Sequence, residues 1–116
     1  MLYDAYLTIT AEYGLLVTNE SYGTINLDTT TLTLVDVISG IDNSYGDLEV
    51  LDSSISIQGH LEDEELYPGT TAISTNCVYF DGSTFDIIDV VYGFYCYDSI
   101  SLNNSSASCL LDNTYH

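Results

Sequence analysis

Hydrophobic and polar residues alternate along most of this chain. Between Leu2 and Ala11 the odd positions carry Tyr, Ala, Leu, Ile and Ala, whereas the even positions after Leu2 carry Asp, Tyr, Thr and Thr. A period of two is typical of a β-strand that buries one face and exposes the other. The segment therefore predicts a half-buried strand with an acidic, hydroxylated outer face.

Segments of the same character follow along the chain. They predict strands at 15–18, 24–27, 31–39, 48–51, 54–58, 77–80, 84–92 and 94–102, with a last short strand at 109–111 after a polar loop over 103–108. Turn residues separate these segments, and the dipeptide Tyr-Gly occurs at Tyr13, Tyr22, Tyr45 and Tyr92. Because its spacing is uneven, we interpret it as a reused turn and not as an internal repeat. Asp81-Gly82 is a strong hairpin signal.

The sequence predicts one domain, residues 1–116, that is all-β or β-dominated α+β. Short strands separated by turn signals every 8–12 residues favour a small antiparallel sandwich or a barrel-like sheet. One segment departs from the pattern, because His60 to Tyr67 carries four consecutive acids and precedes Pro68-Gly69. We expect one short helix or turn there, with Leu61 and Leu66 pointing inward; a solvated loop is the alternative.

Charge changes this picture, because the chain contains no lysine and no arginine against 18 aspartates and glutamates. In average proteins about a quarter of the residues are charged, and both signs are represented. Because the formal charge of this chain is entirely negative, the chain repels nucleic acid and anionic membranes and attracts basic surfaces. It also lacks the cations that P-loop, Schiff-base and arginine-clamped phosphoryl chemistry require. With only His60 and His116 as imidazoles, we expect no enzyme and no catalytic residue.

Metal and cofactor chemistry has no clear signal in the sequence. The stretch from Asp42 to Asp52 lacks the glycine position and the closing glutamate of an EF-hand, and zinc spacing is absent. We expect no cofactor and no metal site; loosely held Ca²⁺ on Glu62–Glu65 is the alternative. The cysteines Cys77, Cys96 and Cys109 are an odd number, which favours reduced thiols over a disulfide framework, with one bridge and a free thiol as the alternative.

No signal peptide and no membrane-length apolar run is visible, so we expect a cytoplasmic protein of a host cell. The sequence predicts an inhibitor that mimics nucleic acid and occupies the basic groove of a nuclease, a CRISPR effector or a similar protein. The composition resembles, as a functional class, that of small phage proteins that block restriction, CRISPR or repair enzymes. We expect the chain itself to bind neither nucleic acid nor membrane. We also expect it to be a monomer or a homodimer. The predicted contacts are acids and two tyrosine anchors: Asp42, Asp47, Glu49, Asp52, Glu62, Asp63, Glu64, Glu65, Tyr45 and Tyr67.

A second hypothesis remains open at this point. The chain has three sequons, at Asn19, Asn103 and Asn104, and strands rich in Ser and Thr. These features are also compatible with an extracellular or virion β-module that is structural or adhesive, and one version of this hypothesis is that the module binds calcium.

The net charge of −18 generates a stability prediction. Self-repulsion opposes compaction, and salt screens it over a Debye length of about 8 Å at physiological ionic strength. We expect the melting temperature, followed by circular dichroism, to rise as NaCl is added. A melting temperature that stays flat or falls with NaCl would contradict this expectation.

Overall fold

The computed structural model describes residues 2–3, 5–11, 13–16, 23–103 and 106–109. Within these ranges the regular elements are strands, and no helix occurs. The strands are β1 (Leu2–Tyr3), β2 (Tyr6–Thr10), β3 (Tyr13–Leu16), β4 (Thr24–Asp28), β5 (Thr31–Val37), β6 (Ser39–Leu51), β7 (Ser54–Gly59), β8 (Leu61–Glu62), β9 (Glu65–Leu66), β10 (Thr71–Asp81), β11 (Thr84–Ile88), β12 (Tyr92–Asn103) and β13 (Ser106–Cys109).

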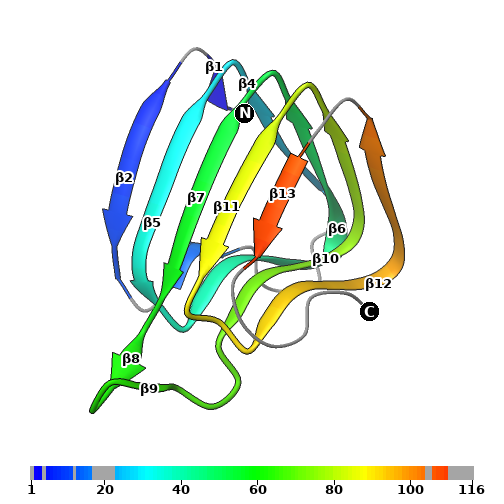
Figure 1. Cartoon of the computed structure of the whole chain (residues 1–116). Coiled ribbons are helices and arrows are strands. Elements are labelled where there is room, and N and C mark those ends of the chain that lie inside the picture. Colours follow the sequence, from blue (N-terminus) through cyan, green and yellow to red (C-terminus); the bar gives the residue numbers. More distant parts are fainter. Residues whose placement is uncertain (1, 4, 12, 17–22, 104–105, 110–116) are drawn as a thin grey trace.

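Apart from β8 and β9, the strands form two parallel sheets that face each other across one core (Figure 1). Sheet A has the order β1-β4-β6-β10-β12, with β3 also paired to β6, and sheet B has the order β2-β5-β7-β11-β13. Both orders follow the chain, because the chain passes from one sheet to the other and returns one strand further along. Each such pass is a coil, and the stacked coils make a parallel β-solenoid.

The prediction of an antiparallel sandwich or barrel was therefore wrong, although the β-rich composition was read correctly. Asp81-Gly82 does not close a hairpin, because β10 and β11 lie in different sheets. β10 pairs with β6 and β12, whereas β11 pairs with β7 and β13. Strand alternation has the same period in parallel and antiparallel sheets, so the hydrophobic pattern alone does not distinguish the two arrangements.

The predicted strands match the structure best where they are short. Segments 24–27 and 54–58 correspond to β4 and β7, while 48–51 and 77–80 are parts of the longer β6 and β10. The stretch from Leu2 to Ala11 contains two strands in different sheets, and the segment 84–92 ends as a strand at Ile88. The predicted loop over 103–108 contains the start of β13, and residues 110–111 lie outside the described residues.

The corner that leads from sheet A to sheet B, which we call the first corner, is built in the same way in successive coils. Thr30, Ser53 and Ser83 occupy the same buried position there. The Ser53 hydroxyl oxygen accepts a hydrogen bond from the backbone N–H of Thr30 at 2.9 Å, and that of Ser83 accepts one from the N–H of Ser53 at 3.1 Å. Each hydroxyl also donates to the carbonyl two residues earlier, at 2.7 Å for Ser53 and 3.1 Å for Ser83. We call this stack the hydroxyl ladder.

The residue before each rung of the ladder turns the chain through a positive φ. The φ angles are 51° at Thr29, 47° at Asp52 and 63° at Gly82. This left-handed conformation favours glycine, and a β-branched residue such as Thr29 adopts it at a cost. An Asp-Gly pair satisfies the same local requirement in a hairpin, which explains why the sequence signal at Asp81 was misread.

The coils constitute an internal repeat, contrary to the prediction. Asp28, Leu51, Asp81 and Asn103 are register partners in neighbouring coils, 23, 30 and 22 residues apart. The Tyr-Gly pairs also sort by coil position. Gly14 and Gly93 stand at equivalent positions in sheet A, while Gly23 and Gly46 directly precede the partners Thr24 and Asp47.

Rows of inward side chains fill the space between the sheets. In sheet B, Leu32, Ile55 and Phe85 stack in one row, and Leu34, Ile57 and Ile87 stack in the next. Sheet A contributes rows such as Leu27, Val50 and Phe80. The rings of Phe80 and Phe85 meet across the core with centroids 3.8 Å apart, and Phe94 lies 5.7 Å from Phe80.

The segment from His60 to Tyr67 is a protruding hairpin and not a helical turn (Figure 1). β8 and β9 pair antiparallel, with Leu61 opposite Leu66 and Glu62 opposite Glu65. Asp63 and Glu64 both have positive φ, at 51° and 64°, as a type I′ turn requires. Leu61 is 37% exposed, so the prediction that it points inward was wrong. This hairpin is inserted at the second corner, from sheet B back to sheet A, and lengthens that coil interval to 30 residues.

The hydroxyl ladder generates a stability prediction. Ser53→Ala leaves the buried N–H of Thr30 without its acceptor, so we expect a loss of about 1–3 kcal/mol in the free energy of unfolding, measured by urea titration. Ser54→Ala, one residue further on and exposed, is the matched control and should change stability by less than about 0.5 kcal/mol. Equal effects of the two substitutions would argue against the ladder.

Candidate functional site

An acidic patch covers the outer side of sheet A beside the first corner. Asp47 and Glu49 lie on β6, Asp28 lies on β4 and Asp81 on β10, and both of these pair with Leu51 of the strand between them. Asp52 adds a further exposed carboxylate at the corner itself, where its side chain lies over Gly82. We call these five residues the acidic face.

The sheet sets the spacing of these carboxylates. Residues two apart on one strand, such as Asp47 and Glu49, are separated by about 6.8 Å, and neighbouring strands by about 4.8 Å. Asp28 and Asp81 are two strands apart, hence about 10 Å. Asp28 Oδ1 accepts a hydrogen bond from the Thr29 hydroxyl at 2.9 Å. The charges are therefore held at fixed intervals by a hydrogen-bonded backbone.

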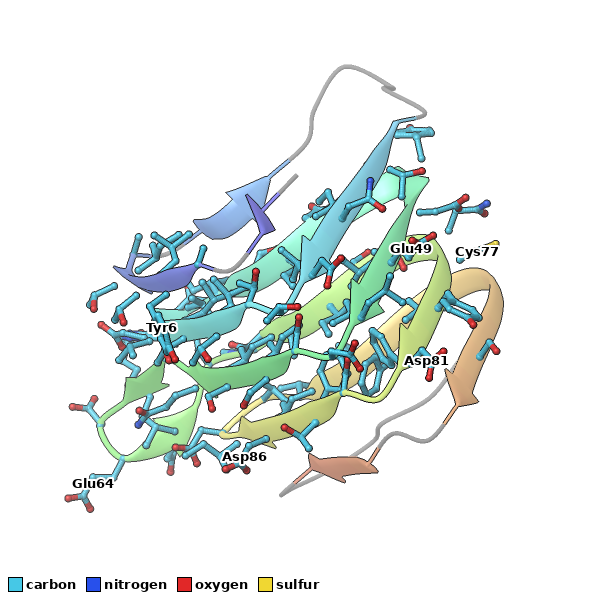
Figure 2. The ribbon with its side chains drawn as sticks, turned by 90° about the horizontal axis from the view of Figure 1, so that it is seen from above. Tyr6, Glu49, Glu64, Cys77, Asp81 and Asp86 are labelled. Carbon is cyan, nitrogen blue, oxygen red and sulfur yellow. The ribbon has the colours of Figure 1, made fainter. Side chains whose placement is uncertain are left out.

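The acidic face is hollowed between its strands. A shallow cavity of about 210 Å³ is lined by Thr24, Asp47, Glu49, Cys77, Tyr79 and Ser101. Tyr79 is 40% exposed at its rim, so its ring is accessible to a partner. Figure 2 shows Glu49, Cys77 and Asp81 on one side of the molecule, with Glu64 at the opposite end.

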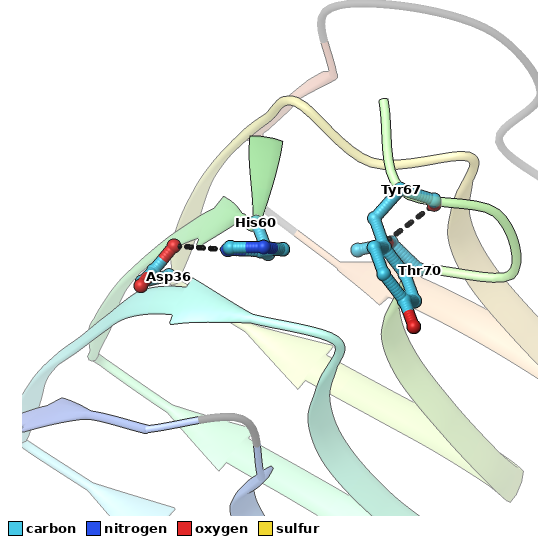
Figure 3. A network of polar contacts seen from close by, with 4 residues as sticks. All are labelled: Asp36, His60, Tyr67 and Thr70. Carbon is cyan, nitrogen blue, oxygen red and sulfur yellow. Dashed lines mark hydrogen bonds and ion pairs between the residues drawn. The ribbon is translucent and has the colours of Figure 1, made fainter. Parts of the chain in front are cut away.

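The one imidazole among the described residues does not neutralise the acidic face. His60 lies at the second corner, where its Nδ1 is 2.7 Å from Oδ1 of Asp36 (Figure 3). The ring of Tyr67 meets His60 edge-on at 5.6 Å between centroids, and the Tyr67 carbonyl accepts a hydrogen bond from the Thr70 hydroxyl at 2.7 Å. His60 thus ties the base of the acidic hairpin to the end of β5. His116 lies outside the described residues.

The structure brings some of the predicted contact residues together and separates others. Asp47, Glu49 and Asp52 belong to the acidic face. Asp42 lies in the first half of β6, before the bend that separates the two halves of sheet A, and the half-exposed Tyr45 lies in that bend. Glu62, Asp63, Glu64 and Glu65 form the exposed hairpin at the second corner, where Tyr67 packs on His60.

Asp28, Asp81 and Tyr79 were not among the predicted contacts. Their closeness to Glu49 arises from the parallel register of β4, β6 and β10, which the sequence did not reveal. Not every acid lies on this face, since Asp86 is on the outside of sheet B and Asp36 and Asp89 are near the second corner.

The remaining chemistry of the described residues is limited. No three His, Cys, Asp or Glu side chains converge there on a point that would hold a metal ion. In the same part of the chain, no helix is long and apolar enough to cross a bilayer. The sequons include residues outside the described ranges.

The thiols of Cys77 and Cys96 lie in contrasting surroundings. Cys77 lies on the acidic face, whereas Cys96 is buried with its sulfur 3.8 Å from the Thr75 hydroxyl. Burial raises the pKa of the Cys96 thiol to about 11, because the thiolate is not solvated there.

Comparison with known proteins adds no assignment, since no family model, no curated protein and no solved structure matches this chain. The class of this protein therefore follows from its own geometry: a parallel β-solenoid with a carboxylate-bearing outer face.

The two thiols generate a reactivity prediction. The thiolate is the attacking form, and a pKa of about 11 leaves on the order of one Cys96 thiol in a thousand ionised at pH 8. We expect iodoacetamide at pH 8 to alkylate Cys77 in the folded protein and Cys96 only after urea unfolding, as read by peptide mass spectrometry. Comparable labelling rates at both cysteines in the native state would contradict this account.

Proposed function

We propose that this chain is a binding protein whose acidic face occupies the cationic nucleic-acid groove of a partner protein and so excludes the nucleic acid. The observation that carries the proposal is the set of carboxylates on neighbouring coils with no lysine or arginine anywhere in the chain. The basic side chains of such a groove are attracted by the carboxylates of this face, and no lysine or arginine of the chain repels them.

The spacing of the acids supports imitation of a phosphate row. Carboxylates at about 5 to 10 Å on a sheet compare with one charge per about 3.4 Å along each strand of B-DNA. The match is within a factor of two to three, which suits electrostatic competition better than the copying of individual contacts. Tyr79, exposed among the acids, supplies a side chain of the kind that dominates binding energy in protein interfaces.

The rigidity of the scaffold also favours this function. The acids stand on strands fixed by hydrogen bonds to neighbouring coils, so binding costs little ordering of the backbone. The exposed hairpin Glu62–Glu65 is a second concentration of charge, but it stands at the other corner and presents an edge instead of a sheet. We therefore assign the groove contact to the acidic face.

The test is competition for DNA with a panel of purified basic nucleic-acid-binding proteins, a nuclease and a CRISPR effector among them, followed by fluorescence anisotropy of labelled duplex. We expect at least one complex to release its DNA at low salt, and the release to weaken as NaCl is added. Absence of competition with every member at low salt would contradict the proposal.

Two triple variants with the same change in net charge locate the contact. Asp47→Asn, Glu49→Gln and Asp81→Asn together should weaken competition at least about tenfold, which is about 1.4 kcal/mol. Glu62→Gln, Glu64→Gln and Glu65→Gln together should weaken it by less than about threefold, because the charge is removed from the other corner. Equal losses in both variants would reduce the effect to total charge and contradict a specific face.

A second candidate function, a structural or adhesive module, is favoured by sheet B. The outward residues of β2, β5, β7 and β11 are aligned across the strands and include one carboxylate, Asp86, an arrangement that a nucleic-acid mimic does not require.

A further inference from the structure

The outer side of sheet B carries ordered rows of hydroxyl groups. Alternation along each strand turns every second residue outward, and the parallel register aligns these residues across β2, β5, β7 and β11. The first row is Tyr6, Thr31, Ser54 and Thr84; the second is Thr8, Thr33, Ser56 and Asp86; the third is Thr10, Val35, Gln58 and Ile88. We call this surface the hydroxyl face.

A shallow groove runs over the second and third rows. It has a volume of about 130 Å³ and is lined on the surface by Thr33, Val35, Ser56, Gln58, Asp86 and Ile88. Hydroxyl, amide and carboxylate groups that donate or accept hydrogen bonds thus stand beside two aliphatic side chains. Tyr6 is 86% exposed on the same side of the sheet, at the β2 end of the first row.

Charge restricts what this groove accommodates. Asp86 is the one carboxylate in the three rows, and none of the rows contains a lysine, arginine or histidine that could hold a phosphate, sulfate or carboxylate group. Anionic polymers are further repelled by the net charge of −18. Anionic ligands are therefore excluded, and the single carboxylate offers a polycation little to bind compared with the acidic face. A ligand that matches hydroxyl, amide and aliphatic groups is uncharged, rich in hydroxyl groups and partly apolar.

We propose that the hydroxyl face binds a neutral polysaccharide that lies across the strands. Sugar hydroxyls would donate to Asp86 and exchange hydrogen bonds with Thr33, Ser56 and Gln58, while Val35 and Ile88 contact the C–H surface of the ring. Strands about 4.8 Å apart repeat these contacts at an interval comparable with the width of a pyranose ring. The exposed Tyr6 ring offers an additional stacking surface.

This inference rests on sheet B alone and not on the proposed inhibitor function. The two faces differ in their expected response to salt. Binding through hydroxyl groups and apolar contact persists in NaCl, whereas binding through the acidic face weakens, because salt screens charge.

The experiment measures depletion of the full chain by suspensions of cellulose, chitin and β-1,3-glucan, at low and at high NaCl. We expect at least one of these polysaccharides to retain the protein at both salt concentrations, and soluble anionic alginate to leave that retention unchanged. No retention by any of the three would overturn the proposal. Shaping of ice crystals without retention on a polysaccharide would also overturn it and would assign the rows to ice.

Matched variants locate the contact. Thr33→Val with Ser56→Ala removes two hydroxyls from the groove, and Asp86→Asn removes its charge; each should weaken retention at least about fivefold. Thr24→Val with Ser101→Ala removes two hydroxyls from the cavity of sheet A, and Asp47→Asn removes a charge there; neither should change retention more than about twofold. Equal losses from the two faces would overturn the proposal.

All of these substitutions are at outward positions, and the melting temperature of each variant establishes that it is folded. Asp47→Asn changes the acidic face and leaves the hydroxyl face intact. Its retention on polysaccharide therefore reports on this inference alone, whereas its competition for DNA reports on the inhibitor function alone.

Discussion

In-register stacking of successive coils is the constraint on which the rest of this structure depends. A single coil cannot enclose its own apolar side chains, so Ile55 is buried only because Leu32 and Phe85 lie on the neighbouring strands. The hydroxyl ladder fixes the same register at the first corner, where each buried N–H finds its acceptor one coil further on. Loss of register would disrupt the core and the ladder together.

The same register sorts the polar residues into two faces of different chemistry. On sheet A it brings Asp28, Glu49 and Asp81 from three strands to one side, although they are far apart in the sequence. On sheet B it aligns Ser and Thr hydroxyls with a single carboxylate, Asp86. The absence of lysine and arginine then acts differently on the two: it leaves the first face strongly anionic and the second almost neutral. The partners that we propose for the two faces are accordingly of different chemistry.

The sequence revealed the strands but not their neighbours. Alternation located β4 and β7 closely, because a period of two does not depend on which strand lies alongside. It did not reveal the parallel topology, since the corner at Gly82 uses the positive φ of a hairpin. The coil repeat was hidden by the hairpin insertion, which lengthens one interval to 30 residues. Of the acidic face, Asp47, Glu49 and Asp52 were predicted as contacts from charge density, and that role stays a prediction; the position of Asp28 and Asp81 beside them required the register.

The most direct test of this account is the backbone register around Gly82, measured by nuclear Overhauser contacts in isotope-labelled protein. Stacked coils predict contacts of Ile55 with both Leu32 and Phe85, with the pattern of parallel strands. A hairpin at Gly82 predicts instead antiparallel contacts between the residues that flank the turn. Antiparallel contacts there, without those of Ile55, would contradict the solenoid and with it both faces.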